Sequence, residues 1–159
     1  MRLSIVMPVY NEGKIIPETI KRVHEAVKTP FELLIVYDMD EDTTVPAVKK
    51  TQAKFKKAKL VKNIYGRGAL NAIKTGLNYA QGDAVCVMMA DLTDDPKTLN
   101  RMMELFDQGY DIVSGSRYMP GGKQIGGPFT KQLMSRVAGI SLHYLTGIST
   151  YDPTNSFRL

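Results

Sequence analysis

The chain has 159 residues, of which 43% are hydrophobic and 23% charged, and a formal net charge of +5. This length and composition are typical of one ordinary globular domain. The single cysteine, Cys86, excludes an internal disulfide and favours a reducing compartment. No apolar stretch approaches the roughly 18 residues of a membrane span, and the N-terminus lacks a signal-peptide pattern. We therefore expect a cytoplasmic protein.

Much of the positive charge lies in one lysine-rich segment, formed by Lys49, Lys50, Lys54, Lys56, Lys57, Lys59 and Lys62. The apolar residues Val48 and Phe55 give this segment a weak helical spacing, so we interpret it mainly as the solvated face of a helix. Contact with an anionic membrane surface stays open. Nucleic acid is disfavoured, because no aromatic residues alternate with the lysines to stack on bases.

The first half of the chain alternates strand and helix patterns. We expect a strand over 3–9, a helix from about 14 to 27, a strand over 31–36, the lysine-rich helix, and a short strand at 60–61. The first helix is predicted by Ile16, Ile20, Val23 and Val27, which recur at helical spacing.

The second half continues the alternation. We expect a helix from Gly68 to about Gly82, a strand over 84–90, a helix to Gly109, a strand at 112–113, a glycine-rich loop over 115–128 and a helix over 131–145. Asp95 followed by Pro96 has the chemistry of an N-cap and a first helical residue. The alternation predicts an α/β fold, a three-layer, mostly parallel open sheet with helices on both faces. One domain is expected over residues 1–159.

An aspartate follows the most continuous apolar run, which extends from Val85 to Ala90. Such a run is typical of a strand covered on both faces, and Asp91 then emerges at its carboxyl end, where α/β sheets bind ligands. A carboxylate there requires a cation or a donor, because an unpaired buried charge is costly. A divalent metal that carries a phosphorylated substrate is the favoured interpretation. The alternative is that Asp91 only helps to begin the next helix.

Other strand ends carry polar residues that should reach the same edge: Pro8 to Glu12, Asp38 and Arg117. Two acidic strand ends and a guanidinium make a plausible metal–diphosphate pocket, since Arg117 can clamp a phosphate with its planar fork. The ring of Tyr10 is suited to lie against a nucleobase.

Several of these acids have simpler interpretations. Glu12 is also expected near a helix start, where its charge favours the dipole. The segment Asp40 to Asp42 is interpreted mainly as a solvated turn. Asp94 and Asp95 look more like capping residues than catalytic bases. Familiar phosphate and zinc motifs are absent: the sequence has no G-x-G-x-x-G after its first strand, no P-loop and no Cys/His spacing for zinc.

Taken together, these segments resemble the family 2 glycosyltransferases, which have the GT-A fold. The opening Ser4 to Glu12 is similar to the start of that family. The segments Gly115-Ser116-Arg117-Tyr118 and Asp152-Pro153-Thr154-Asn155-Ser156-Phe157-Arg158 resemble more specific marks of the polyprenyl-phosphate sugar transferases. The resemblance runs from Arg2 to Leu159.

The resemblance implies a set of site residues. The nucleotide of an activated sugar would be held by Pro8, Tyr10, Glu12, Val36 and Asp38, with Ala90 in contact nearby. Asp91 would bind Mg²⁺ or Mn²⁺, Thr93 would help to complete the metal site, and Arg117 would hold the diphosphate.

One position departs from the family pattern. The family usually has Asp-x-Asp at the end of this strand, and here Met89 stands in the place of the first aspartate. Methionine cannot coordinate a hard cation as a carboxylate does. The metal site is therefore expected to be weaker, or to use another acid such as Asp40 or Asp94.

The resemblance also implies the reaction, an inverting transfer of a hexose from a donor such as GDP-mannose or a UDP-hexose. The implied acceptor is a polyprenyl phosphate, dolichol or undecaprenyl, at the cytoplasmic membrane face. The glycine-rich loop 119–128 is either a lid over substrate or a plain connection. Because members of the family continue beyond this point, the chain is expected to be a catalytic-domain fragment.

Two other functions stay open. A non-catalytic nucleotide-sugar-binding module is suggested by Met89. A nucleotidyltransferase has a similar sheet, but a glycine-rich basic segment would be expected where this chain has Val9 to Glu12.

Overall fold

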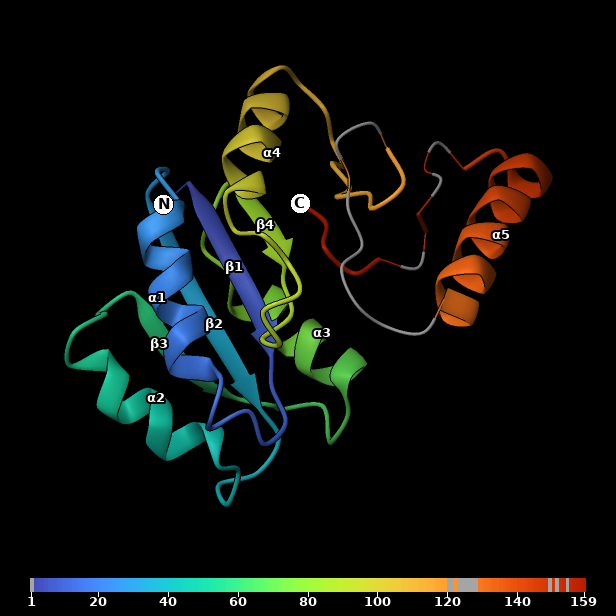
Figure 1. Cartoon of the computed structure of the whole chain (residues 1–159). Coiled ribbons are helices and arrows are strands. Elements are labelled where there is room, and N and C mark those ends of the chain that lie inside the picture. Colours follow the sequence, from blue (N-terminus) through green and yellow to red (C-terminus); the bar gives the residue numbers. More distant parts are fainter. Residues whose placement is uncertain (1, 120–121, 123–128, 149, 151, 154) are drawn as a thin grey trace.

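The computed structural model describes residues 2–119, 122, 129–148, 150, 152–153 and 155–159. Its elements in chain order are β1 (Leu3–Pro8), α1 (Ile16–Ala26), β2 (Phe31–Tyr37), α2 (Thr44–Gln52), β3 (Ala58–Lys62), α3 (Ala69–Tyr79), β4 (Ala84–Val87), α4 (Thr98–Asp107) and α5 (Phe129–Thr146). The four strands form one parallel sheet in the order β3-β2-β1-β4 (Figure 1). The predicted parallel α/β sheet is confirmed.

Helices cover both faces of this sheet. As a result, its central strands β1 and β2 are buried along nearly their whole length. On one face, Ile20 of α1 and Met102 of α4 share a buried cluster with Ile5 of β1. On the other face, Ala72 of α3 packs in a second cluster with Val6 of β1. Gly76 allows this close approach, since a Cβ there would lie 2.2 Å from a methyl carbon of Val6. The three-layer arrangement follows.

Strand β4 ends at Val87, three residues before the predicted end at Ala90. The amide of Met88 still bonds to the Val6 carbonyl at 3.0 Å, but the next amide, that of Met89, donates to Asp94. The carbonyl of Ala90 accepts from Thr19 of α1. The backbone therefore leaves the ladder at Met89 because side chains take over its hydrogen bonds.

The predicted strand at 112–113 is wrong as a parallel strand of the sheet. Residues 113–115 pair instead with the end of the chain: the Val113 amide donates to Leu159 at 2.7 Å and the Gly115 amide to Phe157 at 2.9 Å. Arg158 forms antiparallel bridges to both Val87 and Ser114. The segment 157–159 thus lies between β4 and residues 113–115, and occupies the position next to β4.

Two helices in the second half of the chain differ from expectation. Helix α4 begins at Thr98, two residues after Pro96, because residues 96 and 97 form a turn. Helix α5 is three residues longer than predicted, stands away from the sheet in Figure 1, and exposes apolar side chains, among them Met134, Tyr144 and Leu145. Within the described part of the chain, no helix is both long and apolar enough to cross a bilayer. Of the predicted lid, residues 120–121 and 123–128 lie outside the described residues.

Candidate functional site

The predicted convergence of strand ends at one edge of the sheet is confirmed for β1, β2 and β4. Pro8 pairs in register with Val36, and the Val9 amide donates to the Val36 carbonyl at 3.0 Å. The Met88 amide donates to the carbonyl of Val6, which lies two residues before Pro8 in β1. The segments that begin at Val9, Asp38 and Met89 therefore leave the sheet side by side, at the carboxyl ends of parallel strands, where ligands bind in this class of fold.

The loop after β1 is fastened to the start of α2. Asn11 adopts φ +57°, a left-handed conformation that asparagine tolerates better than most residues. Its amide donates to both oxygens of Asp42, at 3.1 and 3.0 Å, and the Glu12 amide donates to Thr44 Oγ1 at 2.9 Å. The Tyr10 side chain is left 65% exposed at this edge. Its position leaves the ring accessible to a ligand.

Asp42 corrects the prediction that residues 40–42 form a solvated turn. Its side chain is fully buried and also accepts the Thr44 amide at 2.7 Å. Asp40 does conform to the prediction, because it is exposed and paired with Lys62. Its partner is Lys62 of β3, and among the described residues no hydrogen bond or ion pair joins Asp40 to the turn after β4, so its use in place of an acid at Met89 stays a prediction.

Asp38 follows β2 and holds the loop that leads into α3. Its Oδ1 accepts Asn63 Nδ2 and its Oδ2 accepts the Gly68 amide, both at 2.8 Å. Gly68 has φ +118°, which side chains other than glycine rarely adopt. Asp38 therefore shapes the wall of the site at its β2 side. Its contact with a nucleotide stays a prediction.

The turn after β4 presents Asp91 to solvent. Thr93 donates to Asp91 Oδ1 twice, from its amide at 3.1 Å and its hydroxyl at 2.6 Å. Leu92 between them has φ +64°, a strained conformation for a leucine. Ala90 is buried, and its carbonyl accepts Thr19 Oγ1 at 2.7 Å. The turn is thereby fixed to α1 while the second oxygen of Asp91 stays without a hydrogen bond among the described residues.

Asp94 and Asp95 follow in the same turn but point to different partners. Asp95 accepts the Lys97 amide at 3.1 Å and supports the turn before α4, but the N-cap of that helix is Lys97, so the predicted N-cap role of Asp95 is wrong. A capping role is also wrong for Asp94, whose Oδ2 accepts the Met89 amide at 3.0 Å. Burial chiefly, and then the charge of Asp91, raise the pKa of Asp94, while the Met89 amide and Arg117 oppose this rise.

The chemistry of this turn fits a hard divalent cation. Asp91, Thr93 and Asp94 offer only oxygen atoms, the ligands that Mg²⁺ and Mn²⁺ prefer. Among the residues that the structure describes, no group of three or more His, Cys, Asp or Glu side chains is placed to hold a metal. A cation here would therefore depend on two carboxylates and on oxygens of its ligand, which is the usual arrangement where the substrate carries phosphates.

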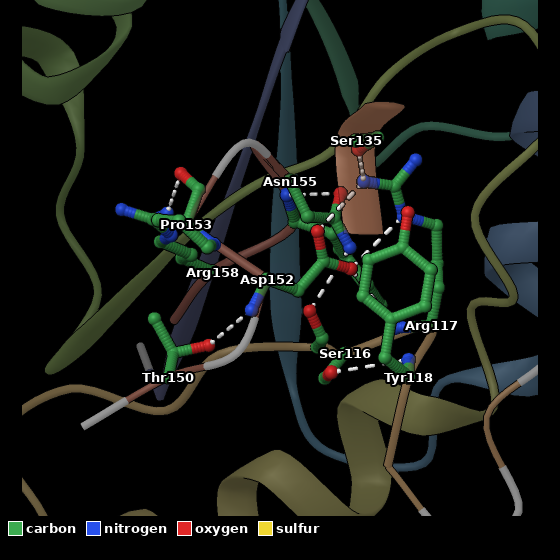
Figure 2. Close-up of polar contacts among 11 residues, drawn as sticks. Ser116, Arg117, Tyr118, Ser135, Thr150, Asp152, Pro153, Asn155 and Arg158 are labelled. Carbon is green, nitrogen blue, oxygen red and sulfur yellow. Dashed lines mark hydrogen bonds and ion pairs between the residues drawn. The ribbon is translucent and has the colours of Figure 1, made fainter. Parts of the chain in front are cut away.

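Arg117 lies beyond the sheet edge and is paired with Asp152 (Figure 2). Its Nη2 and Nε donate to the two oxygens of this buried carboxylate at 2.6 and 2.9 Å, and its backbone amide adds a third bond at 3.0 Å. These bonds raise the pKa of Arg117 further above its ordinary value. The pair orients the guanidinium, and its predicted contact with a diphosphate stays a prediction.

The segment around Asp152 is bound to the loop that carries Arg117. Asn155 Nδ2 donates to the Gly115 carbonyl at 2.9 Å, and Arg158 donates to the carbonyl of Pro153 (Figure 2). A Cβ at Gly115 would lie 2.8 Å from the Phe157 ring. The two segments that the sequence singled out as specific marks therefore form one unit.

Sequence reasoning missed three residues that shape the site: Asp42, Asn63 and the role of Asp152. A signal existed for the first, because Asp-Thr-Thr directly before a helix is an N-terminal capping pattern. Asn63 and Asp152 act on residues 25 and 35 positions away, which no local pattern indicates.

Comparison with known proteins identifies the family. The model of "Glycosyl transferase family 2" matches residues 4–159. The chain is 31% identical to a dolichol-phosphate mannosyltransferase of Pyrococcus furiosus, over 99% of this chain and 45% of that protein. It is 28% identical to the polyprenol monophosphomannose synthase of Mycolicibacterium smegmatis, over 99% of this chain and 60% of that protein.

Solved structures agree on the fold. A mannosyltransferase from Pyrobaculum calidifontis, solved with GDP-Man and Mn²⁺, aligns with a TM-score of 0.63 and 28% identity, over 72% of this chain and 35% of that one. Glucosyl-3-phosphoglycerate synthase from Mycobacterium tuberculosis aligns with a TM-score of 0.73 and 18% identity, over 99% of this chain and 55% of that one. The fold is thus of the GT-A type.

The chain spans about half the length of the curated relatives it matches. Within that span the family model covers nearly every residue, including the loop after β1, the turn after β4 and the Arg117–Asp152 unit. The chain belongs to glycosyl transferase family 2.

Proposed function

We propose that this chain is the catalytic domain of a metal-dependent, inverting glycosyltransferase that moves a hexose from a nucleotide diphosphate sugar to a polyprenyl phosphate. The observation that carries the proposal is the edge formed by β1, β2 and β4. There the exposed ring of Tyr10, the carboxylate of Asp38 and the oxygen-rich turn at Asp91 leave the sheet together.

The nucleotide lies at the β1 and β2 side of this edge. Tyr10 provides an exposed ring for the base, and the loop after β1 is held rigid by its bonds to Asp42 and Thr44. Pro8, Glu12, Val36 and Asp38 complete this side. A preformed wall of this kind lowers the ordering cost of binding.

The diphosphate lies at the β4 side, near Asp91. Asp91 and Thr93 would hold a divalent cation there, which would supply positive charge to stabilise the departing diphosphate. Asp91, with Thr93 and Ala90 beside it, positions that end of the donor. Arg117, which Asp152 orients, would hold the same diphosphate.

The proposed acceptor is supported by relatives that are named for dolichol, polyprenol and undecaprenyl phosphates. A phosphate oxygen of the acceptor attacks the anomeric carbon while the bond to the nucleoside diphosphate breaks and its electron pair leaves with the diphosphate. Single displacement inverts the anomeric centre. A phosphate monoester is already an anion near neutral pH, so this chemistry requires no strong general base.

The acceptor side is supported by the segment between Asp111 and Asp152, which has no acidic residue and contains Arg117, Lys123, Lys131 and Arg136. It includes α5, with its exposed apolar side chains. A segment whose sequence is basic and which also carries exposed apolar side chains suits a lipid phosphate at an anionic membrane face. Peripheral binding to the cytoplasmic face is part of the proposal.

A thermal-shift panel tests the donor side. GDP-mannose, UDP-glucose and related donors are added with and without Mn²⁺, and the matched donor at about 100 times its Kd should add roughly 2.7 kcal/mol of stability. Asp91→Ala should abolish the metal-dependent part of the shift. If no donor raises the melting temperature in the presence of Mn²⁺, the proposal is wrong.

Sugar transfer then separates the enzyme from a binding module. Mass spectrometry should detect a glycosylated polyprenyl phosphate when donor, Mn²⁺ and a short-chain acceptor are supplied. Donor binding without transfer or donor hydrolysis, in a protein extended to the length of its relatives, would favour the non-catalytic module that Met89 suggests.

A further inference from the structure

The turn after β4 contains a second acid, Asp94, outside the two positions of the Asp-x-Asp pattern. Met89 stands where an aspartate is usual, and the carboxylate of Asp94 folds back onto the backbone of that residue. Asp94 Oδ2 accepts the Met89 amide at 3.0 Å, so this carboxylate is held against the backbone of the residue that lacks one.

The hydrogen bonds of the turn leave oxygen atoms on two acids. Asp91 uses Oδ1 for both bonds from Thr93, and Asp94 uses Oδ2 for the bond from Met89. Within the described part of the chain, Asp91 Oδ2 and Asp94 Oδ1 make no hydrogen bond. The two acids lie three residues apart in one turn, where the charge of Asp91 opposes that of Asp94 and the charge of Arg117 favours it. A cation between them would remove that repulsion.

Neighbouring acids do not share these properties. Asp95 is one residue away, but its carboxylate faces the Lys97 amide at the start of α4. Asp40 is exposed and paired with Lys62. Only Asp94, of these three, combines contact with Met89 and electrostatic coupling to Asp91.

We infer that Asp94 is the second carboxylate ligand of the divalent cation, beside Asp91, and takes over the function of the acid that is absent at Met89. The inference rests on the proposed function, since it assigns a ligand to the metal of that site. Mg²⁺ and Mn²⁺ are commonly held by one or two carboxylates together with substrate phosphates. Asp91 and Asp94 supply the protein part of such a set.

Direct Mn²⁺ binding tests this assignment without reference to activity. Electron paramagnetic resonance gives the Kd for Mn²⁺ in the presence of saturating UDP or GDP, and also for Mn²⁺ alone. Asp94→Asn should raise this Kd about tenfold or more, because ligand charge sets affinity at such sites. Asparagine has one side-chain oxygen, which the Met89 amide retains, so the turn keeps its hydrogen bond but loses the ligand.

Asp95→Asn is the matched control, since it removes the same charge one residue away. Its Kd for Mn²⁺ should stay within about twofold of that of the original chain, as expected for a solvated charge outside the site. Circular dichroism and metal-free melting establish that both variants are folded.

A rescue variant separates a ligand from a merely structural residue. Met89→Asp combined with Asp94→Asn should recover most of the lost Mn²⁺ affinity, because it returns a carboxylate to the same place. Unchanged Mn²⁺ affinity in Asp94→Asn, or an equal loss in Asp95→Asn, would overturn the inference while metal-dependent donor binding leaves the proposed function intact. If the original chain binds no Mn²⁺ with either nucleotide, both fail together.

Discussion

Two groups of acids leave the same edge of the sheet, and they are used differently. Asp42, after β2, is fully buried, and both of its oxygens accept backbone amides. Asp91 and Asp94, after β4, each keep one oxygen without a hydrogen bond among the described residues. The comparison indicates that an acid at this edge is available to a ligand only where backbone amides do not already bond to both of its oxygens.

The largest effect is expected at Asp42. Asp42→Ala should lower the free energy of unfolding by about 3 kcal/mol, because the amides of Asn11 and Thr44 lose their acceptor inside the protein. Urea denaturation measures this. Asp40→Ala is the control and should change stability by less than about 0.5 kcal/mol. A loss below about 1 kcal/mol for Asp42→Ala would remove the distinction between the two groups.

The next effect concerns the close contact between the loop after β1 and α2. A Cβ at Gly13 would lie 2.4 Å from the Thr43 carbonyl oxygen, so Gly13→Ala must push the two loops apart. We expect a loss of about 2 kcal/mol in unfolding free energy and weaker donor binding. Calorimetric titration with the matched donor measures the donor affinity. Donor affinity equal to that of the original chain would show that the fastening of this loop does not serve the site.

Glu32 extends the comparison to the other end of the strands, because it is the second residue of β2. Burial alone raises the pKa of Glu32, but hydrogen bonds from Ser4 Oγ, Lys59 Nζ and the Gln81 amide outweigh burial and hold this pKa below its ordinary value. A lowered folded-state pKa contributes stability above the unfolded value of about 4.3, and the contribution is lost as pH falls through the folded value.

Glu32→Gln should therefore cost about 1 kcal/mol at pH 7, after allowance for solvent around Lys59, and the cost should shrink toward pH 3. Melting curves across this range measure it. Glu18→Gln, an exposed acid on α1, should leave the pH profile unchanged. An equal cost at pH 3 and pH 7 would contradict the assigned sign.

The smallest effect is a gain. The pKa of Asp94 is raised, so this acid contributes stability below its unfolded value that is lost as pH rises through its folded value. In the absence of metal, Asp94→Asn should therefore melt slightly higher than the original chain at pH 7, and the difference should disappear below about pH 4. A lower melting temperature of Asp94→Asn than of the original chain would show that Asp94, like Asp42, stabilises the fold through its contacts.

The sequence predicted the sheet well, because the buried runs in β1, β2 and β4 and the helical spacing in α1 and α4 are strong local signals. It also predicted that Pro8, Asp38 and Asp91 meet at one edge, since parallel strands impose this. It could not predict that Asp42 is buried or that Asp152 holds Arg117. These contacts join residues 31 and 35 positions apart, and the hydrogen bonds that satisfy each acid are decided by tertiary structure.

The same limit explains the errors at the end of β4. A run of six apolar residues predicts a longer strand, but the bond from the Met89 amide to Asp94 and the bond from Thr19 to Ala90 end it early. The predicted strand at 112–113 was apolar as expected, yet its partner is the segment 157–159. Local hydrophobicity indicates that a segment is extended and does not identify its neighbour.

The position of residues 157–159 has a consequence for the order in which the molecule is built. During synthesis β1, β2 and β3 can pair as soon as residue 62 has left the ribosome, whereas the border of β4 is completed about a hundred residues later. The turn with Asp91 and Asp94 follows directly on that late border. Domains fold progressively as they emerge, so a nascent chain should complete the ends of β1 and β2 early and the turn with Asp91 and Asp94 last.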